Sequence, residues 1–165
     1  MKAPQLRLHG FLRETGAAHQ VIEHPPCRSS AESLAARSQA GYPEAVGAKA
    51  LIVVPRKTPS FVLLVLPGMH RLDSNAVRRE LGAFRFASAQ EVHEASDGLE
   101  AGAIPPFAAP VMPGVATLLV DSSLFTYPWI GFNAASFTSS VILHSAVYAA
   151  LPMSMRRIEM AVAAA

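Results

Sequence analysis

Residues 50–66, ALIVVPRKTPSFVLLVL, are the stretch of this 165-residue chain that decides its fold class. Two apolar runs, Ala50 to Val54 and Phe61 to Leu66, are rich in β-branched and aliphatic residues and flank Pro-Arg-Lys-Thr-Pro. Runs of this length bounded by prolines are typical of buried strands. A membrane-spanning helix needs about 20 uninterrupted apolar residues. The stretch therefore predicts two buried strands joined by a loop.

Capping residues and glycines divide the rest of the chain into short helices and strands. Asp73 is a candidate N-cap for a helix through Leu81, and Ser29 and Ser88 each precede a glutamate by three residues, as in a capping box. Further strands are expected at 19–23, 84–87, 115–120, 129–133 and 141–143, a long loop at 98–114, and helical segments at 6–16, 146–151 and 155–162. Strands come in adjacent pairs, which favours an α+β fold with a curled, mixed and mainly antiparallel sheet, barrel-like and surrounded by helices.

Length and composition predict one domain, residues 1–165, that acts in the cytoplasm. Apolar residues make up 51% of the chain and the mean hydropathy is +0.28, but the first residues are charged and show no export signal. Cys27 is the only cysteine, so no internal disulfide forms. The last four residues, 162–165, are expected to fray.

The net charge of +2 permits a nucleic-acid partner without requiring one. A duplex-binding protein usually shows a denser basic surface. The basic pairs Arg56-Lys57, Arg78-Arg79 and Arg156-Arg157 are candidates for phosphate contacts, although such pairs are more often solvated surface.

Lys49 stands out because it precedes the first apolar run. The segment Gly41 to Ala50 is similar to a phosphate-binding loop, but Ala48 separates Gly47 from Lys49 and no hydroxyl follows, so the spacing excludes that motif. An ammonium at the start of a buried strand needs a partner or an exit to solvent. Two interpretations stay open, a lysine that reaches the surface and a fixed cation that polarises a substrate oxygen.

Two further segments are candidates for a binding site. Gly102, Ala103, Ile104, Pro105, Pro106 and Phe107 form a rigid proline-rich stretch that suits either a pocket wall or a surface connection. Asn133, Ala134, Ala135 and Ser136 place an amide and a hydroxyl beside two small residues, which suits either close approach of a ligand or a tight turn.

The histidines and the cysteine predict neither a metal site nor a covalent mechanism. His24 and Cys27 are close in sequence, but a catalytic cysteine usually receives its histidine from far along the chain. The histidines lack metal-ligand spacing, and no nucleophile elbow is present. We therefore expect no metal and no cofactor.

Four motifs, taken together and in order, resemble those of the YbaK-like family of prolyl-tRNA-editing deacylases. They are Val-Gly-Ala-Lys49-Ala-Leu-Ile-Val, Gly102-Ala-Ile-Pro-Pro106-Phe107, Val-Asp121-Ser-Ser-Leu and Phe-Asn133-Ala-Ala-Ser. The resemblance also includes His24-Pro25-Pro26 and covers nearly the whole chain.

The resemblance implies a hydrolase that removes wrong amino acids, commonly Ala, Cys or Ser, from tRNA for proline. In that scheme Lys49 holds and polarises the ester, and the segment from Gly102 to Pro106 bounds the pocket and supplies backbone hydrogen bonds. A water attacks the carbonyl, helped by the terminal ribose hydroxyl. The implied partner is the aminoacylated end of tRNA, with no metal, cofactor or membrane, and no oligomeric state is indicated.

The sequence departs from the family pattern at two places. Ala134 and Ala135 stand where relatives often have two glycines, and Ser140 stands where one branch is often acidic. Both departures bear on which amino acid fits. Two alternatives therefore remain, a non-catalytic module that binds an aminoacyl or nucleotide-like ligand, and a hydrolase for another small acyl ester.

Overall fold

The predicted pair of buried strands is present in the computed structural model, which describes residues 1–163. Strands β2 (Val46–Pro55) and β3 (Val62–Pro67) pair antiparallel, and every residue of β3 is buried. Strand β2 begins four residues before the predicted Ala50 because its first residues pair with a different strand, β7 (Trp129–Asn133). Lys49 therefore lies within the strand and not at its beginning.

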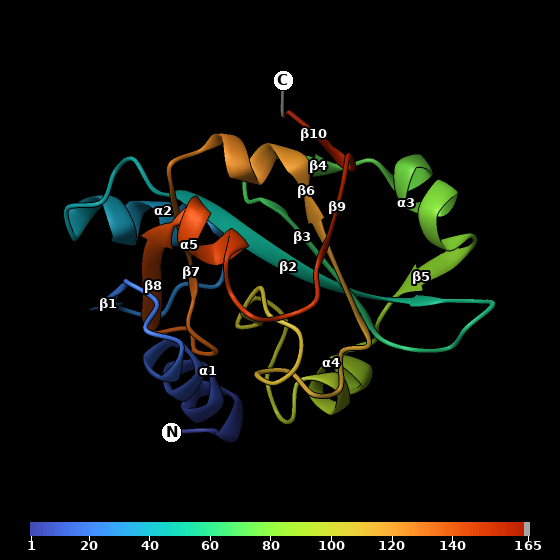
Figure 1. Cartoon of the computed structure of the whole chain (residues 1–165), viewed down its shortest axis with the longest axis horizontal. Coiled ribbons are helices and arrows are strands. Elements are labelled where there is room, and N and C mark those ends of the chain that lie inside the picture. Colours follow the sequence, from blue (N-terminus) through green and yellow to red (C-terminus); the bar gives the residue numbers. More distant parts are fainter. Residues whose placement is uncertain (164–165) are drawn as a thin grey trace.

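The main sheet has the strand order β1-β8-β7-β2-β3-β6-β9, with β5 paired to the far end of β2 (Figure 1). Parallel pairs join β2 to β7, β3 to β6 and β6 to β9, and the remaining pairs are antiparallel. The mixed, mainly antiparallel α+β fold is confirmed, although the sheet does not close into a barrel. The bounds are β1 (Gln20–Glu23), β4 (Arg71–Leu72), β5 (Phe84–Phe86), β6 (Thr117–Asp121), β7 (Trp129–Asn133), β8 (Ser139–His144), β9 (Arg156–Ile158) and β10 (Ala161–Val162).

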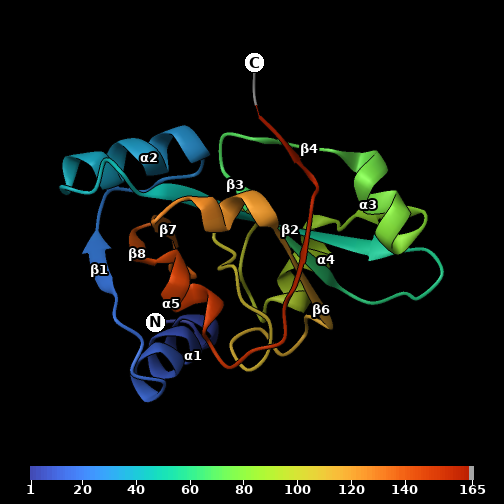
Figure 2. The same ribbon diagram turned by 45° about the horizontal axis from the view of Figure 1, so that its top comes forward.

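Capping residues placed the starts of α2, α3 and α4 correctly, whereas α1 begins three residues before the expected Leu6. Asp73 accepts backbone hydrogen bonds at the start of α3, and Ser88 and Glu91 form a complete capping box on α4. Figures 1 and 2 show α2 beside the first half of β2 and α3 near its far end. The helices are α1 (Ala3–Glu14), α2 (Ser30–Gln39), α3 (Ser74–Leu81), α4 (Ala89–Ala95), α5 (Ser145–Ala149) and the 3₁₀ turn η1 (Ser122–Thr126). No helix within residues 1–163 is long and apolar enough to span a bilayer.

The prediction of a closing helical segment at 155–162 is wrong. These residues form β9, parallel to β6, and β10, antiparallel to β4. The backbone N–H groups of Met160 and Ala161 donate to the Asp121 carboxylate at 2.7 and 2.8 Å, which holds this segment extended. Of the expected frayed end, residues 164–165 lie outside the described part of the chain.

The long loop at 98–114 contains no helix or strand, as predicted. Its apolar residues Phe107, Val111 and Met112 are fully buried in the main core with residues of α1 and β7. The Phe107 ring packs edge-on against Phe11 and Phe132. The loop is therefore anchored by side chains, which fixes the position of Gly102 at its beginning.

Candidate functional site

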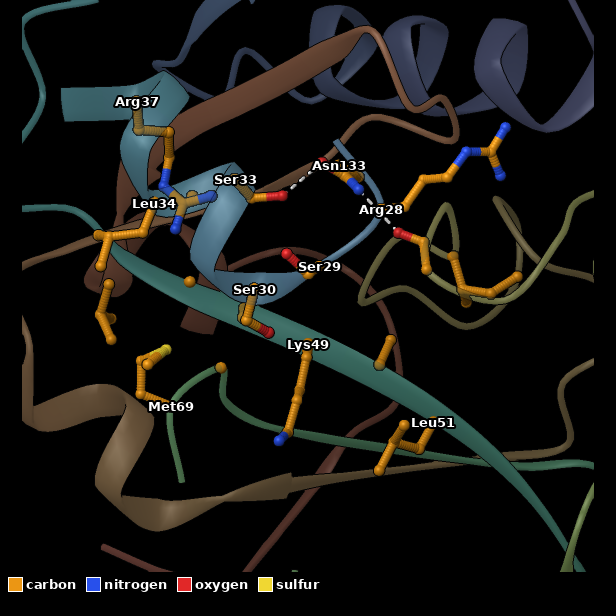
Figure 3. A pocket seen from close by; sticks show the side chains of 18 residues that line it. Arg28, Ser29, Ser30, Ser33, Leu34, Arg37, Lys49, Leu51, Met69 and Asn133 are labelled. Carbon is orange, nitrogen blue, oxygen red and sulfur yellow. Dashed lines mark hydrogen bonds between the residues drawn. The ribbon is translucent and has the colours of Figure 1, made fainter. Parts of the chain in front are cut away.

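A cavity of about 410 Å³ lies between α2, the first half of β2, the end of β7 and the start of the 98–114 loop (Figure 3). The described residues that line it include the cations Arg28, Arg37 and Lys49 and no aspartate or glutamate. A cavity of this size accepts a small ligand or one nucleotide-sized group. Its lining predicts a ligand that carries negative charge.

Strand alternation gives the cavity its floor. Gly47, Lys49 and Leu51 lie on one face of β2, because successive side chains point to opposite faces. On the neighbouring β7, Gly131 lies directly opposite Gly47 in register, and Asn133 follows two residues later on the same face. The floor thus combines two glycines with a cation and an amide.

Helix α2 covers this floor with an unusual inward stripe. Ser30, Ser33, Leu34 and Arg37 line the cavity at spacings of three and four residues, the positions where a helix on a sheet normally carries apolar side chains. Ser33 and Arg37 are both buried. Polar groups therefore separate the helix from the sheet, and this separation leaves room for the cavity.

Lys49 projects from β2 with part of its hydrogen-bonding capacity free. Its Nζ donates to the backbone oxygen of His70 at 2.7 Å, and burial lowers the pKa of the ammonium below its ordinary value. No ion pair in residues 1–163 includes Lys49. An ammonium has three N–H donors, so two remain for a ligand or solvent.

Arg37 is 2% exposed, and its buried Nε has no hydrogen-bond partner among residues 1–163. The side chain fits the slot that the two facing glycines leave. A Cβ added to Gly47 would lie 2.8 Å from Arg37 Nη2, and one added to Gly131 would lie 2.8 Å from Arg37 Nε. Burial lowers the pKa of the guanidinium, yet arginine stays charged in proteins. The cavity therefore has a second, largely buried cation.

Asn133 links the sheet to the loop. Its Nδ2 donates to the Gly102 oxygen at 2.7 Å, and its Oδ1 accepts from the hydroxyls of Ser33 and Ser140 at 3.5 Å each. His24 Nε2 lies 2.7 Å from Ser140 Oγ, which extends the network to the end of β1. These contacts fix the amide orientation and the height of the loop above the cavity.

Of the candidate site residues, the structure brings Lys49, Gly102, Ile104 and Asn133 together around the cavity. The other candidates lie behind it or beside it. Four of them are buried, Ala103, Pro105, Pro106 and Phe107. The buried Tyr148 hydroxyl donates to the Pro106 backbone oxygen at 2.6 Å. Ala134 and Ala135 are buried after β7, Ala135 with a φ of +56°, and the Ser136 hydroxyl lies beside Thr138. Ser140 and His24 reach the cavity only through Asn133.

Cys27 is unsuited to nucleophilic attack. Burial, followed by the nearby Glu32 charge, raises the pKa of its thiol, and its Sγ donates to the Pro25 backbone oxygen at 3.3 Å. A thiolate, not a thiol, is the nucleophile. Within residues 1–163, no group of three or more His, Cys, Asp or Glu side chains is placed to hold a metal ion.

Sequence reasoning missed Arg37 and Ser33 as cavity residues. The signal was present, since both fall on the stripe of α2 that begins at Ser30 and recurs every three or four residues. Recognising Arg37 also required the glycines of two other strands to be placed opposite each other. Only the fold shows that arrangement.

The fold and the cavity define a class of protein, a small α+β protein with a cation-lined ligand cavity between a helix and a mixed sheet. Residues 24–151 match the model of the family described as "Aminoacyl-tRNA editing domain". Because this match covers more than half of the 165 residues, the chain belongs to the aminoacyl-tRNA editing domain family. The resemblance inferred from the four motifs is confirmed at this level.

Solved structures share the fold at low sequence identity. A hypothetical protein superposes with a TM-score of 0.79 at 22% identity, over 94% of this chain and 99% of that one. A scaffold protein from a study of epitope grafting gives 0.80 at 19% identity, over 99% and 100%. A "putative trans-editing enzyme for prolyl tRNA synthetase" gives 0.74 at 21% identity, over 98% and 99%. No curated protein sequence matches the chain significantly.

Proposed function

We propose that this protein is a trans-editing hydrolase, acting in the cytoplasm, that deacylates tRNA for proline carrying a small wrong amino acid such as Ala, Cys or Ser. Membership of the aminoacyl-tRNA editing domain family supports the substrate class. The shared fold with a structure described as a prolyl trans-editing enzyme supports the choice of proline. The single observation that carries the proposal is Lys49, a partly buried ammonium with free donors in a cavity whose described lining residues include no carboxylate.

In the proposed mechanism Lys49 binds the ester region and stabilises the negative charge that develops on the carbonyl oxygen. A fixed, partly desolvated cation is effective for this purpose because it needs no reorganisation during the reaction. The attacking water is assisted by the terminal ribose hydroxyl of the tRNA. The water oxygen bonds to the carbonyl carbon, and the ester bond between that carbon and the ribose oxygen breaks. A proton from the water passes to the ribose oxygen, so the products are free amino acid and tRNA.

The test is release of labelled amino acid from tRNA for proline charged with Ala, Cys, Ser or Thr. We expect the wild-type protein to deacylate at least one of these substrates. Lys49→Ala should lower the rate about 100-fold or more, the scale seen when one oxyanion donor is removed. The matched control is Lys2→Ala, which removes an exposed lysine that precedes α1 and does not line the cavity, and it should leave the rate unchanged.

Equal rates for wild type and Lys49→Ala would refute the proposed role of Lys49. No cleavage of any substrate, with ligand-dependent stabilisation of the folded protein, would replace the hydrolase with a binding module of the same fold. If a small acyl ester without the tRNA body were hydrolysed as fast as the mischarged tRNA, the protein would be a hydrolase of small esters and tRNA would not be its specific substrate.

A further inference from the structure

Arg37 is a charged side chain in the cavity for which no role is yet assigned. It is 2% exposed, its Nε has no partner, and no ion pair in residues 1–163 includes it. A buried charge without a partner destabilises the folded protein. A ligand whose negative group pairs with the guanidinium would therefore explain why this charge has no partner in the protein.

The surroundings of Arg37 are built for this cation. Gly47 and Gly131 face each other across β2 and β7, and a side chain at either position would displace the guanidinium. Figure 3 shows Arg37 reaching the cavity from α2, while Lys49 reaches it from β2. The two cations thus come from different walls of one cavity and are free to bind different parts of one ligand.

The charge distribution selects the chemistry of that ligand. Arg28, Arg37 and Lys49 line the cavity together with Ser29 and Ser30 at the start of α2, and the described lining residues include no carboxylate. The N-terminus of a ten-residue helix adds partial positive charge and free backbone N–H groups. A guanidinium presents its donors as a fork that matches the oxygens of a phosphate.

We propose that Arg37 binds the phosphate group attached to the terminal nucleotide of the tRNA. The inference rests on the proposed function, in which Lys49 holds the ester on the ribose of the same nucleotide. A small amino acid such as Ala, Cys or Ser has no negative group of its own, so the adjacent phosphate is the anion that every substrate brings to the site. Arg37 is a binding and positioning residue in this scheme, and Lys49 acts at the ester.

Adenosine 5′-monophosphate and adenosine are probes that differ only in this phosphate. Their dissociation constants are measured by isothermal titration for the wild-type protein, Arg37→Gln and Arg37→Lys. We expect the wild type to bind the monophosphate roughly tenfold more tightly than adenosine, as charge-assisted hydrogen bonds are worth. Arg37→Gln should bring the two constants within about twofold, while Arg37→Lys, which keeps the charge and loses the fork, should retain part of the preference.

The matched control is Arg13→Gln, which removes an exposed arginine from α1 that does not line the cavity. It should leave the preference for the monophosphate unchanged. A preference that is absent in the wild type, or that survives in Arg37→Gln, overturns the inference. So does a preference that Arg13→Gln abolishes as fully as Arg37→Gln.

The deacylation assay separates this inference from the proposed function. A protein that cleaves no mischarged tRNA but shows the Arg37-dependent preference refutes the hydrolase and leaves the phosphate site. A protein that cleaves mischarged tRNA without that preference retains the hydrolase and loses the phosphate site.

Discussion

Asp121 and Arg37 are both buried charges, 3% and 2% exposed, but their surroundings differ. The Asp121 carboxylate accepts from the backbone N–H groups of Met160, Ala161 and Ser123 at 2.7, 2.8 and 3.0 Å and from the Ser123 hydroxyl. The Arg37 guanidinium has an unpartnered Nε and no carboxylate partner in residues 1–163. A charge with its partners complete holds the chain together, and a charge without partners is available for a ligand.

The largest effect should come from removing the satisfied charge. Asp121→Ala leaves the backbone N–H groups of Met160, Ala161 and Ser123 without their acceptor, and we expect it to lower the free energy of unfolding by about 3 to 5 kcal/mol. Urea unfolding measures the change. The control Glu100→Ala removes a carboxylate whose side chain is 67% exposed and pairs with Arg28, and it should cost less than about 1 kcal/mol. Similar small losses for both variants would show that Asp121 is not a structural charge.

Removing the unpaired charge of Arg37 should change the free energy of unfolding in the opposite direction. Arg37→Met keeps the length of the side chain and removes the desolvated guanidinium, so we expect the free energy of unfolding to rise by about 1 to 2 kcal/mol. The control is Arg7→Met. Arg7 Nη2 is also buried without a partner among residues 1–163, but Arg7 Nε donates to the Val111 oxygen at 2.8 Å and Nη1 contacts Asp97 at 3.2 Å. Arg7→Met should lower stability by about 1 kcal/mol. A loss in Arg37→Met as large as that in Arg7→Met would mean that Arg37 is structural.

The same contrast explains which features the sequence predicted. Helix starts at Ser88 and Asp73 and the strand pair around residues 50–66 depend on neighbours in sequence, and they were placed correctly. The end of the chain was predicted as helix because its strand character depends on distant partners. Those partners are β6, β4 and the Asp121 carboxylate.

The sequence predicted only part of the candidate site, because some of its residues are brought together by contacts between segments that are distant in sequence. The family resemblance identified Lys49, Gly102, Ile104 and Asn133, and the structure gathers these around one cavity. Arg37 was missed because its burial depends on glycines in two strands that are distant in sequence and adjacent only in the sheet. The spacing along α2 indicates that Arg37 faces the sheet, but it does not indicate that the guanidinium is buried and unpaired.

The smallest effect tests the slot itself. Gly47→Ala places a Cβ 2.8 Å from Arg37 Nη2, whereas in an Arg37→Ala background the same methyl meets open space. Alanine is otherwise favoured over glycine within a strand by roughly 0.5 to 1 kcal/mol. We therefore expect Gly47→Ala to destabilise the wild type slightly and to stabilise the Arg37→Ala protein, with a coupling energy of about 1 kcal/mol.

Gly10→Ala is the matched control for that cycle, because nothing lies within 4 Å of a Cβ added at Gly10 in α1. It should add roughly 0.5 to 1 kcal/mol in both backgrounds, as expected for glycine to alanine in a helix. Additive behaviour at Gly10 with coupling at Gly47 would place the Arg37 guanidinium in the glycine slot in solution. Additivity at both positions would mean that the guanidinium leaves the slot, and Arg37 would then lose its distinction from an ordinary surface arginine.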